Sequence, residues 1–477
     1  MAKNERAASS VLARWRRWMA LAILIAACAA PGSRAQASSL KVLHSFCAKV
    51  DCIDGEQPNA PLIMDKTGRL YGTTYYGGAR CRESGTPTGC GTVFELALAD
   101  NRWTETALYS FCAKVNGNGY CADGVNPNTA GLIFDAVGNL YGTTSSGGTN
   151  NYGAVFEMTP NNSTNPTKWT ESVPYDFCGV NSCASEPYAG LIMGQTGHFY
   201  GTTYQGGRFN GGTIFELVYD AATKKWTAAT LYSFCAKGGT ACTDGAMPEA
   251  PLVMDDSGNL YGTTYGGGAA NYGTAFMLTS NNPSKPTKWT ETVLHSFCVK
   301  ENCPDGYFIT TPLVMDKAGT LYGSSALGGP NCPFSCGLVF NLTPLDKAKT
   351  KWSEASIYVF CAKTDCIDGM SPKGNLTIDP STGTLYGTTQ SGGNNCISTG
   401  GCGTIFQVSF DTRTKKWAET VLHSFCADLN SGNCADGNYP EAGVIMDKSG
   451  NLYGTTVAGG TQCAASGGCG TAFELEK

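Results

Sequence analysis

GNLYGTTYGGGAANYGTAF, residues 258–276, is the stretch that decides the fold, because close variants of it occur seven times in the 477-residue chain. Each copy places a tyrosine at the same point of the phrase: Tyr71, Tyr141, Tyr200, Tyr261, Tyr322, Tyr386 and Tyr453. The repeating unit is roughly 57 to 70 residues long. A phrase that recurs at a near-constant interval indicates an array of similar supersecondary units.

Each unit contains four short apolar segments, which in the first copy are residues 60–65, 69–75, 91–97 and 102–111. The segments have strand length, are rich in β-branched and aromatic residues, and are bounded by turn sequences such as Asp-Lys-Thr-Gly. No window beyond the N-terminal 37 residues has a convincing helical period. We therefore predict an all-β fold.

The fourth segment indicates how the array closes. It begins near a tryptophan in six copies: Trp103, Trp169, Trp226, Trp289, Trp352 and Trp417. The seventh copy precedes the first unit, because LKVLHSFC at residues 40–47 matches TVLHSFC at residues 292–298, and the chain stops after the third segment of unit seven. In a β-propeller the N-terminal strand commonly completes the last blade and removes both open edges. We predict that residues 38–477 form one domain, a seven-bladed β-propeller of four-stranded antiparallel blades closed in this way, with the tryptophans packed between blades.

The first 37 residues have the parts of a secretory signal peptide: a basic start, an apolar run over residues 19–30, and Ala-Gln-Ala ending at Ala37. Cleavage after Ala37 releases a soluble protein. Alternatively, Ile-Ala-Ala-Cys ending at Cys28 resembles a bacterial lipobox, in which Cys28 is lipidated and becomes the mature N-terminus. Both routes predict an extracytoplasmic protein (secreted, periplasmic or lipid-anchored) without a transmembrane span in the mature chain.

Charge narrows the choice of partner. Without residues 1–37 the chain has 27 basic and 37 acidic residues, a net charge of −10. Nucleic acids and anionic membranes attract basic surfaces. We therefore expect no nucleic-acid partner, and we expect a monomer that binds a glycan or an extracellular protein.

The 22 cysteines after Cys28 fall into close pairs with none left over. Seven pairs lie in the loops that join one blade to the next, the inter-blade loops: Cys47–Cys52, Cys112–Cys121, Cys178–Cys183, Cys235–Cys242, Cys298–Cys303, Cys361–Cys366 and Cys426–Cys434. Four lie in glycine-rich loops between the second and third strands: Cys81–Cys90, Cys332–Cys336, Cys396–Cys402 and Cys463–Cys469. An exported chain meets an oxidising compartment, so disulfides are expected; zinc binding is the alternative.

Propeller topology places both kinds of loop on the same face. All eleven expected disulfides therefore lie on this face, which we call the stapled face. The opposite, hairpin face carries the turns between the first and second and between the third and fourth strands. Since recognition usually resides in loops held by a rigid scaffold, the stapled face is the candidate working surface.

An Asp-Gly pair precedes the first strand in six repeats: Asp54, Asp123, Asp244, Asp305, Asp368 and Asp436. The innermost strands of a propeller border its central channel, so these carboxylates are binding candidates that could ring the channel mouth. Such a ring could hold Ca²⁺, which prefers oxygen ligands, or hydrogen-bond to sugar hydroxyls. The alternative is ordinary turn chemistry, in which the aspartate bonds to nearby backbone. No other cofactor is expected.

Blade three departs from the pattern. Its inter-blade loop has Ser185-Glu186 in place of Asp-Gly, followed by Tyr188. Glu186 and Tyr188 are the candidates for a catalytic acid with a stacking partner, and simple drift of one repeat is the alternative. His44, His295 and His423 occupy a place that is tyrosine in the other copies, so a packing role is expected for them.

The repeat phrase is also recognisable as a whole. Asp-x-x-Gly-Asn-Leu-Tyr-Gly-Thr-Thr, then Gly-Gly, then Gly-Thr-x-Phe-x-Leu, then Leu-Tyr-Ser-Phe, resembles the GloVer-type tandem repeat of exported bacterial proteins. That family is termed "choice of anchor" because its members attach to the surface in different ways. The resemblance implies an exported, propeller-like protein and brings no catalytic residues with it.

Three functions are compatible with these features. The first is a non-enzymatic, exported scaffold that binds glycans or proteins through its stapled face, because near-identical loops suit multivalent binding better than catalysis. The alternative is an extracellular carbohydrate-active hydrolase or lyase that uses carboxylates on that face. The third is a purely structural envelope protein. A single strongly perturbed carboxylate in a pocket on the stapled face would favour the enzyme, whereas a shallow, repetitive surface would favour binding.

Overall fold

The computed structural model describes residues 39–477 apart from ten segments: 80–88, 128–130, 163–167, 179–182, 239–241, 283–287, 331–335, 395–401, 428–433 and 462–468. Residues Leu40–Glu476 form the unit considered below. The expected signal peptide and Cys28 lie outside the described residues.

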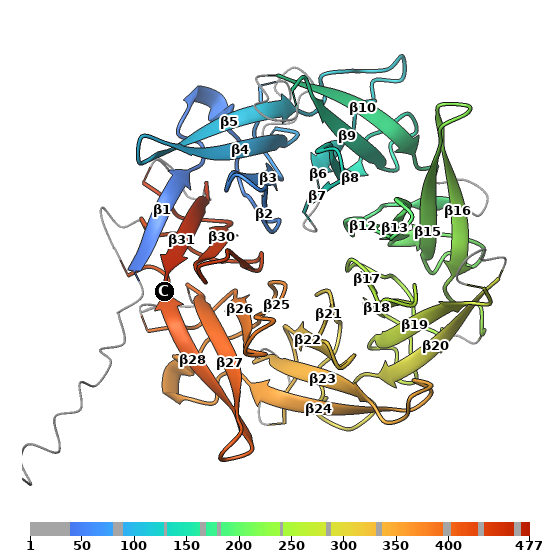
Figure 1. Ribbon diagram of the computed structural model, residues 1–477, viewed down its shortest axis with the longest axis vertical. Helices are drawn as coiled ribbons and strands as arrows, with labels where there is room; N and C mark the ends of the chain where they lie inside the picture. The colour runs from blue at the N-terminus through green and yellow to red at the C-terminus, as the bar shows by residue number, and fades with distance from the viewer. Residues whose placement is uncertain are drawn as a thin grey trace, which may run out of the picture. The chain divides into compact units, whose positions relative to one another are not determined.

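Seven antiparallel sheets are arranged in a ring around a common centre (Figure 1). From the centre outward, blade one consists of β2 (Ile63–Met64), β3 (Leu70–Thr74), β4 (Thr92–Ala99) and β5 (Arg102–Ser110). Blade two consists of β7 (Ile133–Phe134), β8 (Leu140–Ser146), β9 (Ala154–Pro160) and β10 (Trp169–Asp176), and β6 (Val125–Pro127) also pairs with β8. Blade three consists of β12 (Ile192–Met193), β13 (Phe199–Thr203), β15 (Thr213–Asp220) and β16 (Lys225–Ser233), and β11 (Ala184–Ser185) pairs separately with β14 (Gln205–Gly206).

The other blades repeat the same order. Blade four is β17 (Val253–Met254), β18 (Leu260–Thr264), β19 (Thr274–Ser280) and β20 (Trp289–Ser296). Blade five is β21 (Val314–Met315), β22 (Leu321–Ser325), β23 (Leu338–Pro344) and β24 (Trp352–Val359). Blade six is β25 (Thr377–Ile378), β26 (Leu385–Thr389), β27 (Thr404–Asp411) and β28 (Lys416–Ser424). The short 3-10 turns η1 (Val50–Cys52) and η3 (Thr364–Cys366) lie in inter-blade loops.

Blade seven closes the ring as predicted. Its strands are β29 (Ile445–Met446), β30 (Leu452–Thr456), β31 (Thr471–Glu476) and, outermost, the N-terminal strand β1 (Ser39–Ser45). Phe46 is fully buried, and its N–H donates to the carbonyl of Gly470 at 3.0 Å. The sequence prediction of a seven-bladed propeller closed by its N-terminal strand is therefore confirmed.

The repeated phrase forms the second strand of each blade, and the side chains on both faces of this strand are buried against neighbouring residues. All five residues of β3 are buried. A side chain at Gly72 would meet Phe94 at 2.6 Å and Leu62 at 2.9 Å, so only glycine fits there. Tyr71 packs edge-to-face on Trp169 of blade two, with ring centroids 6.0 Å apart. The tryptophan of the outer strand thus packs between blades, as the sequence indicates.

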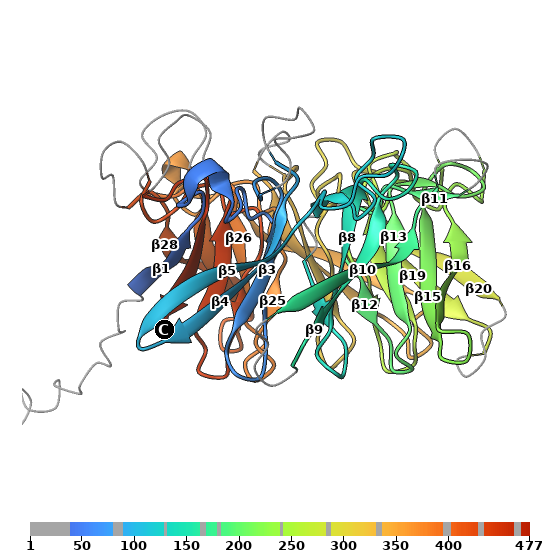
Figure 2. The ribbon, with the colours of Figure 1, turned by 90° about the horizontal axis from the view of Figure 1, so that it is seen from above.

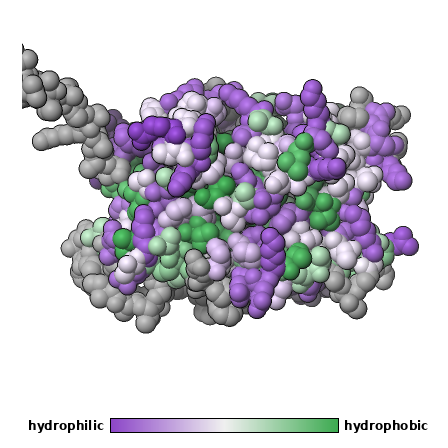
Figure 3. Space-filling model, turned by 90° about the horizontal axis from the view of Figure 1, so that it is seen from below, coloured by the Kyte–Doolittle hydropathy of each residue, from purple (hydrophilic) through white to green (hydrophobic). Residues whose placement is uncertain are grey.

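The two faces differ in their loops (Figure 2). Inter-blade loops and second-to-third-strand loops emerge on the stapled face, and the strand hairpins emerge on the other. On the outer side of the ring shown in Figure 3, hydrophilic residues surround small, separate hydrophobic patches. Within the part of the chain that is described, no helix is long and apolar enough to cross a membrane.

The inter-blade loops contain seven disulfides: Cys47–Cys52, Cys112–Cys121, Cys178–Cys183, Cys235–Cys242, Cys298–Cys303, Cys361–Cys366 and Cys426–Cys434. These bonds indicate an oxidising, extracytoplasmic environment. The second set of pairs is described at one end only. Cys90, Cys336, Cys402 and Cys469 are disulfide-bonded, and their expected partners Cys81, Cys332, Cys396 and Cys463 lie outside the described residues.

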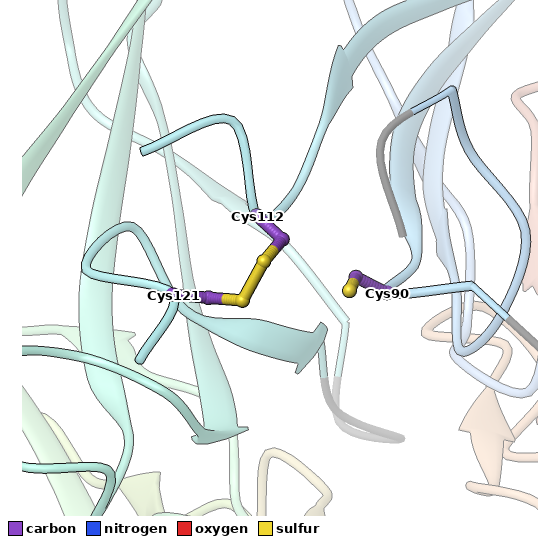
Figure 4. Close-up of side chains that lie close together, drawn as sticks. All are labelled: Cys90, Cys112 and Cys121. Atoms are coloured by element: carbon purple, nitrogen blue, oxygen red, sulfur yellow. A yellow bond between two sulfur atoms is a disulfide. The ribbon is translucent and has the colours of Figure 1, made fainter. Parts of the chain in front are cut away.

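The sulfur of Cys90 lies close to the Cys112–Cys121 disulfide (Figure 4). Cys402 lies in the same way beside Cys426 and Cys434. Zinc binds thiolates, and these cysteines are disulfide-bonded. The close approach therefore reflects neighbouring disulfides and gives no support to the zinc alternative.

Candidate binding site at the mouth of the central channel

A cavity of about 530 Å³ lies on the stapled face where the loops of six blades converge. Loops from so many blades meet only around the central axis of the ring, so this cavity lies at the mouth of the central channel. We call it the channel-mouth site. It is lined by Asn59, Tyr75, Tyr188, Tyr204, Glu249, Pro251, Thr310, Pro312, Lys373, Asn375 and Glu441.

One position of the repeat supplies most of the polar lining. It lies in the inter-blade loop shortly before the innermost strand and holds Asn59, Asn128, Tyr188, Glu249, Thr310, Lys373 and Glu441 in the seven copies. Six of these residues line the cavity, and Asn128 lies outside the described residues. The scaffold is thus nearly sevenfold, whereas the chemistry at its centre is asymmetric.

The backbone that presents this position is the same in every blade. The residue two places earlier has a positive φ in all seven copies, although none is glycine: Gln57, Asn126, Glu186, Met247, Phe308, Ser371 and Tyr439. The N–H of Gln57 donates to Cys469 of blade seven at 3.1 Å, and that of Glu186 donates to Tyr152 of blade two at 3.0 Å. Left-handed backbone at non-glycine residues is uncommon and persists where surrounding contacts impose it. These inter-blade bonds impose it here.

Aromatic residues form one side of the site. Tyr188 and Tyr204 pack edge-to-face, with ring centroids 5.1 Å apart, and Tyr75 lines the same cavity. From the next two blades, Tyr265 stacks on Phe308 with centroids 4.4 Å apart and planes 9° apart. The candidate Tyr188 therefore lies among aromatic side chains at the channel mouth.

Charged residues from blades four, six and seven form another part of the site. Burial raises the pKa of Glu249 to about 7. Glu441 accepts a hydrogen bond from Gln390 and pairs with the Lys373 ammonium at 3.4 Å. The site thus holds one carboxyl group whose pKa is raised by burial and a second that faces a cation.

The candidate Glu186 of blade three, whose pKa is also raised by burial, does not line the cavity. It occupies the repeat position of Gln57, so the expectation that Ser185-Glu186 stand in place of the Asp-Gly pair is wrong.

The six Asp-Gly carboxylates lie elsewhere. They are not among the cavity-lining residues and instead contact the tyrosine or histidine of the outermost strand. Tyr109 donates to Asp123 at 2.6 Å, and Nε2 of His295 lies 2.7 Å from Asp305. The equivalent pairs are His44–Asp54, Tyr232–Asp244, Tyr358–Asp368 and His423–Asp436. The ligand-binding role of these aspartates stays a prediction, and the structure gives them a role in holding the loops.

Beside these pairs is an ion pair that sequence reasoning missed. Lys49 of one inter-blade loop contacts Glu105 in the outer strand of the following blade at 2.7 Å. The same contact recurs as Lys114–Glu171, Lys237–Glu291 and Lys363–Glu419. The recurring Phe-Cys-Ala-Lys sequence and the recurring glutamate were visible in the repeats, but nothing local showed that they meet across a blade boundary.

The channel-mouth position was also missed, although a signal for it exists. Aligning the seven inter-blade loops shows a recurring proline or isoleucine followed by a residue that changes in most copies. Where the rest of the repeat hardly changes, a position that varies in this way indicates that folding of the blade does not require one particular side chain there.

The geometry described so far defines the class: a disulfide-stapled seven-bladed β-propeller with an asymmetric site at its channel mouth. The Gloeobacter/Verrucomicrobia repeat model matches residues 33–165, 81–242, 134–357 and 240–473. The chain therefore belongs to the Gloeobacter/Verrucomicrobia repeat family, in agreement with the resemblance seen in its repeat phrase.

Solved structures with a similar chain path include a putative oxidoreductase (glucose dehydrogenase) from Thermus thermophilus. It is 11% identical, the match covers 92% of this chain and 100% of that one, and the TM-score is 0.39. Another is an α-L-arabinanase from Penicillium chrysogenum complexed with arabinobiose, at 12% identity, 81% and 98% coverage and a TM-score of 0.41. No curated protein matches the sequence.

Proposed function

We propose that this protein is an exported binding protein that takes a carbohydrate at the channel-mouth site. The observation that carries the proposal is the lining of that site, where Tyr75, Tyr188 and Tyr204 adjoin amide, hydroxyl and charged groups. Sugars present flat C–H faces to aromatic rings and hydroxyl groups to polar side chains, and pockets of this mixed kind bind small molecules.

Asymmetry supports one central ligand over several equivalent ones. The position that lines the cavity holds Asn, Tyr, Glu, Thr or Lys depending on the blade. Seven similar sites would require similar residues, whereas one ligand spanning the mouth makes a different contact with each blade. The binding is therefore central, and the stapled loops serve as its rigid support.

Export is part of the proposal. Residues 1–37 have the sequence of a signal peptide, and the seven described disulfides suit an oxidising compartment. Lipid attachment at Cys28 is the alternative fate of the N-terminus. The acidic balance of the remaining chain argues against a nucleic-acid ligand.

A second candidate function, glycoside cleavage, is favoured by Glu249 and Glu441. Cleaving a glycosidic bond requires one carboxyl group that donates a proton and one carboxylate that attacks the sugar or activates water. Burial raises the pKa of Glu249 to about 7, as suits a proton donor, and Glu441 faces Lys373. A carboxyl group with a raised pKa in the same cavity as a carboxylate that faces a cation is the arrangement expected of an acid and base pair.

The test uses residues 38–477 and a panel of polysaccharides, with and without Ca²⁺. Retention on each polymer and release of reducing or unsaturated ends are measured in parallel. Tyr188→Ala and Tyr204→Ala should each weaken retention about tenfold, as loss of an aromatic platform implies, and Tyr120→Ala, on an exposed tyrosine of the same face, should not. Retention that survives both substitutions would contradict the proposed site.

The same panel separates the two functions. Retention without product supports the binding protein, and dependence on Ca²⁺ would assign a role to the Asp-Gly carboxylates. Product formation that Glu249→Gln abolishes, while retention persists, would establish the enzyme.

A further inference from the structure

A second cavity, of about 460 Å³, lies on the hairpin face between blades two and three. Blade two contributes Asp135, Asn139, Tyr141 and Glu157, and blade three contributes Phe199 and Trp226. We call it the blade 2/3 groove. It lies on the face opposite the channel-mouth site and does not depend on the function proposed for that site.

In the acidic half of the groove, the carboxylates of Asp135 and Glu157 accept hydrogen bonds from uncharged side chains, and one of these donors is shared between them. The Asn139 amide donates to Asp135 Oδ2 at 2.8 Å and to Glu157 Oε1 at 3.3 Å. The Tyr141 hydroxyl donates to Glu157 Oε1 at 2.7 Å. Among the described residues, neither carboxylate forms an ion pair with a basic side chain.

In other repeats a basic side chain lies at this place. Three further blades have a glutamate at the position of Glu157, and each is paired. Glu95 has Arg69 at 4.0 Å, Glu216 has His198 at 2.8 Å, and Glu474 has Lys41 at 3.8 Å. In two of these blades the basic residue, Arg69 or His198, occupies the repeat position that Asn139 holds in blade two. Glu157 is thus the one described glutamate at this position without a basic partner.

Blades four and five show which cation the hairpin accepts. Asp255 and Tyr261 are the counterparts of Asp135 and Tyr141. There, Lys349 of blade five inserts its ammonium 2.8 Å from Asp255 Oδ2 and 3.0 Å from the Tyr261 hydroxyl, and 5.4 Å from the centroid of the tyrosine ring. The same hairpin therefore binds a lysine side chain when the neighbouring blade supplies one.

The aromatic half of the groove suits the rest of such a side chain. Trp226 stacks on Phe199 with ring centroids 5.6 Å apart, and it contacts Tyr219 at 5.1 Å. Tyr219 remains 48% exposed. Aromatic faces attract ammonium groups and pack against methylene chains. Phe199 stands where the other six repeats have leucine, so the aromatic wall is particular to this interface.

We propose that the blade 2/3 groove binds a lysine side chain of a partner protein. The ammonium lies beside the Asp135 and Glu157 carboxylates, and the alkyl chain lies against Trp226 and the exposed Tyr219. The lysine takes the place that Lys349 occupies in its own chain between blades four and five.

The experiment follows the indole N–H signal of Trp226 by NMR in protein labelled with ¹⁵N-tryptophan, assigned by Trp226→Phe. The probe is Nα-acetyl-lysine amide, which keeps its side-chain ammonium, and Nα-acetyl-norleucine amide is the uncharged control. We expect a saturable shift with lysine amide, at least tenfold weaker binding in Glu157→Gln, and no saturable shift with norleucine amide. Glutamine occupies this repeat position in blade six, as Gln407, so the variant should fold.

The matched control is Glu216→Gln, the same change at the glutamate already paired with His198. It should leave lysine-amide binding unchanged. Equal binding of norleucine amide, or unaltered binding in Glu157→Gln, would overturn the proposal. A shift with choline or glucosamine but none with lysine amide would overturn it as well, because the groove would then recognise a small organic cation.

Discussion

Lys237 Nζ lies 2.7 Å from Glu291 Oε2, across the boundary between blades three and four. The lysine follows Cys235 in an inter-blade loop, and the glutamate is buried in β20. At the boundary of blades two and three, Ala228 replaces the glutamate, and Phe-Cys-Gly-Val at residues 177–180 lacks the lysine. Both partners are absent together at this boundary, and we expect that each such ion pair, which we call a latch, stabilises the blade boundary that it spans.

Replacing Lys237 by methionine should lower the free energy of unfolding by about 1–3 kcal/mol, the usual effect of leaving a buried acceptor unpaired. Burial raises the pKa of Glu291, and the Lys237 ammonium opposes that rise. A carboxyl group with a raised folded-state pKa binds its proton more tightly in the folded state, so its stabilising effect falls as the pH increases. Denaturant unfolding should therefore show a larger loss at pH 8 than at pH 5.

Two companion variants make this prediction specific. Lys225→Met, on an exposed lysine of blade three, should have little effect. Adding Glu291→Ala to Lys237→Met should recover much of the loss, because it recreates the uncharged arrangement of blades two and three. A loss that does not depend on pH, or an equal loss in Lys225→Met, would contradict the latch.

Removal of β1 should open the ring. A chain that begins at Cys47 lacks the strand that pairs with β31, and it loses buried Leu43 and Phe46, each worth about 1.5–3 kcal/mol. The free edge of β31 should also promote self-association. We expect a strongly lowered melting temperature and oligomers in gel filtration, with a chain beginning at Ser38 as the control. An unchanged melting curve would refute closure by β1.

Glu249 should make stability depend on pH in a recognisable way. Its pKa is raised to about 7 by burial, so the folded protein is destabilised as the pH increases from the ordinary glutamate value of 4.5 through 7. Glu249→Gln removes this titration. The variant should melt like the wild type at pH 5 and at a higher temperature at pH 8, and parallel melting curves across that range would show that Glu249 is an ordinary exposed glutamate.

Thiol content tests the disulfide framework. Exported protein should show no alkylation by intact mass before reduction, and modification of all 22 cysteines after Cys28 once it is reduced and unfolded. Alkylation that requires only a chelator would instead indicate zinc bound by thiolates. The measurement includes the four pairs that are described at one end only.

Much of the fold could be predicted because its determinants are local and repeated. The Leu-Tyr-Gly phrase around Tyr261 specifies a strand that is buried on both sides, and its seven copies set the number of blades. The match between residues 40–47 and 292–298 placed β1 in blade seven. The two cysteines of each inter-blade loop pair with one another because the loop brings them together. Backbone propensity and short-range pairing decide all of these features.

The sites depend on proximity between residues that are distant in the chain. Only the closed ring places Tyr188 beside Glu249 and, together with Glu441, around one cavity. The Asp-Gly residues illustrate the limit: their recurrence was plain in the sequence, but their direction, toward the outer strand and away from the channel, depends on Tyr109 and its counterparts. Sequence alone therefore determined the propeller and its stapled loops, through local pairing repeated seven times. The tertiary structure decided which variable side chains meet at the channel mouth and which carboxylates, among the described residues, lie in the blade 2/3 groove without a basic partner.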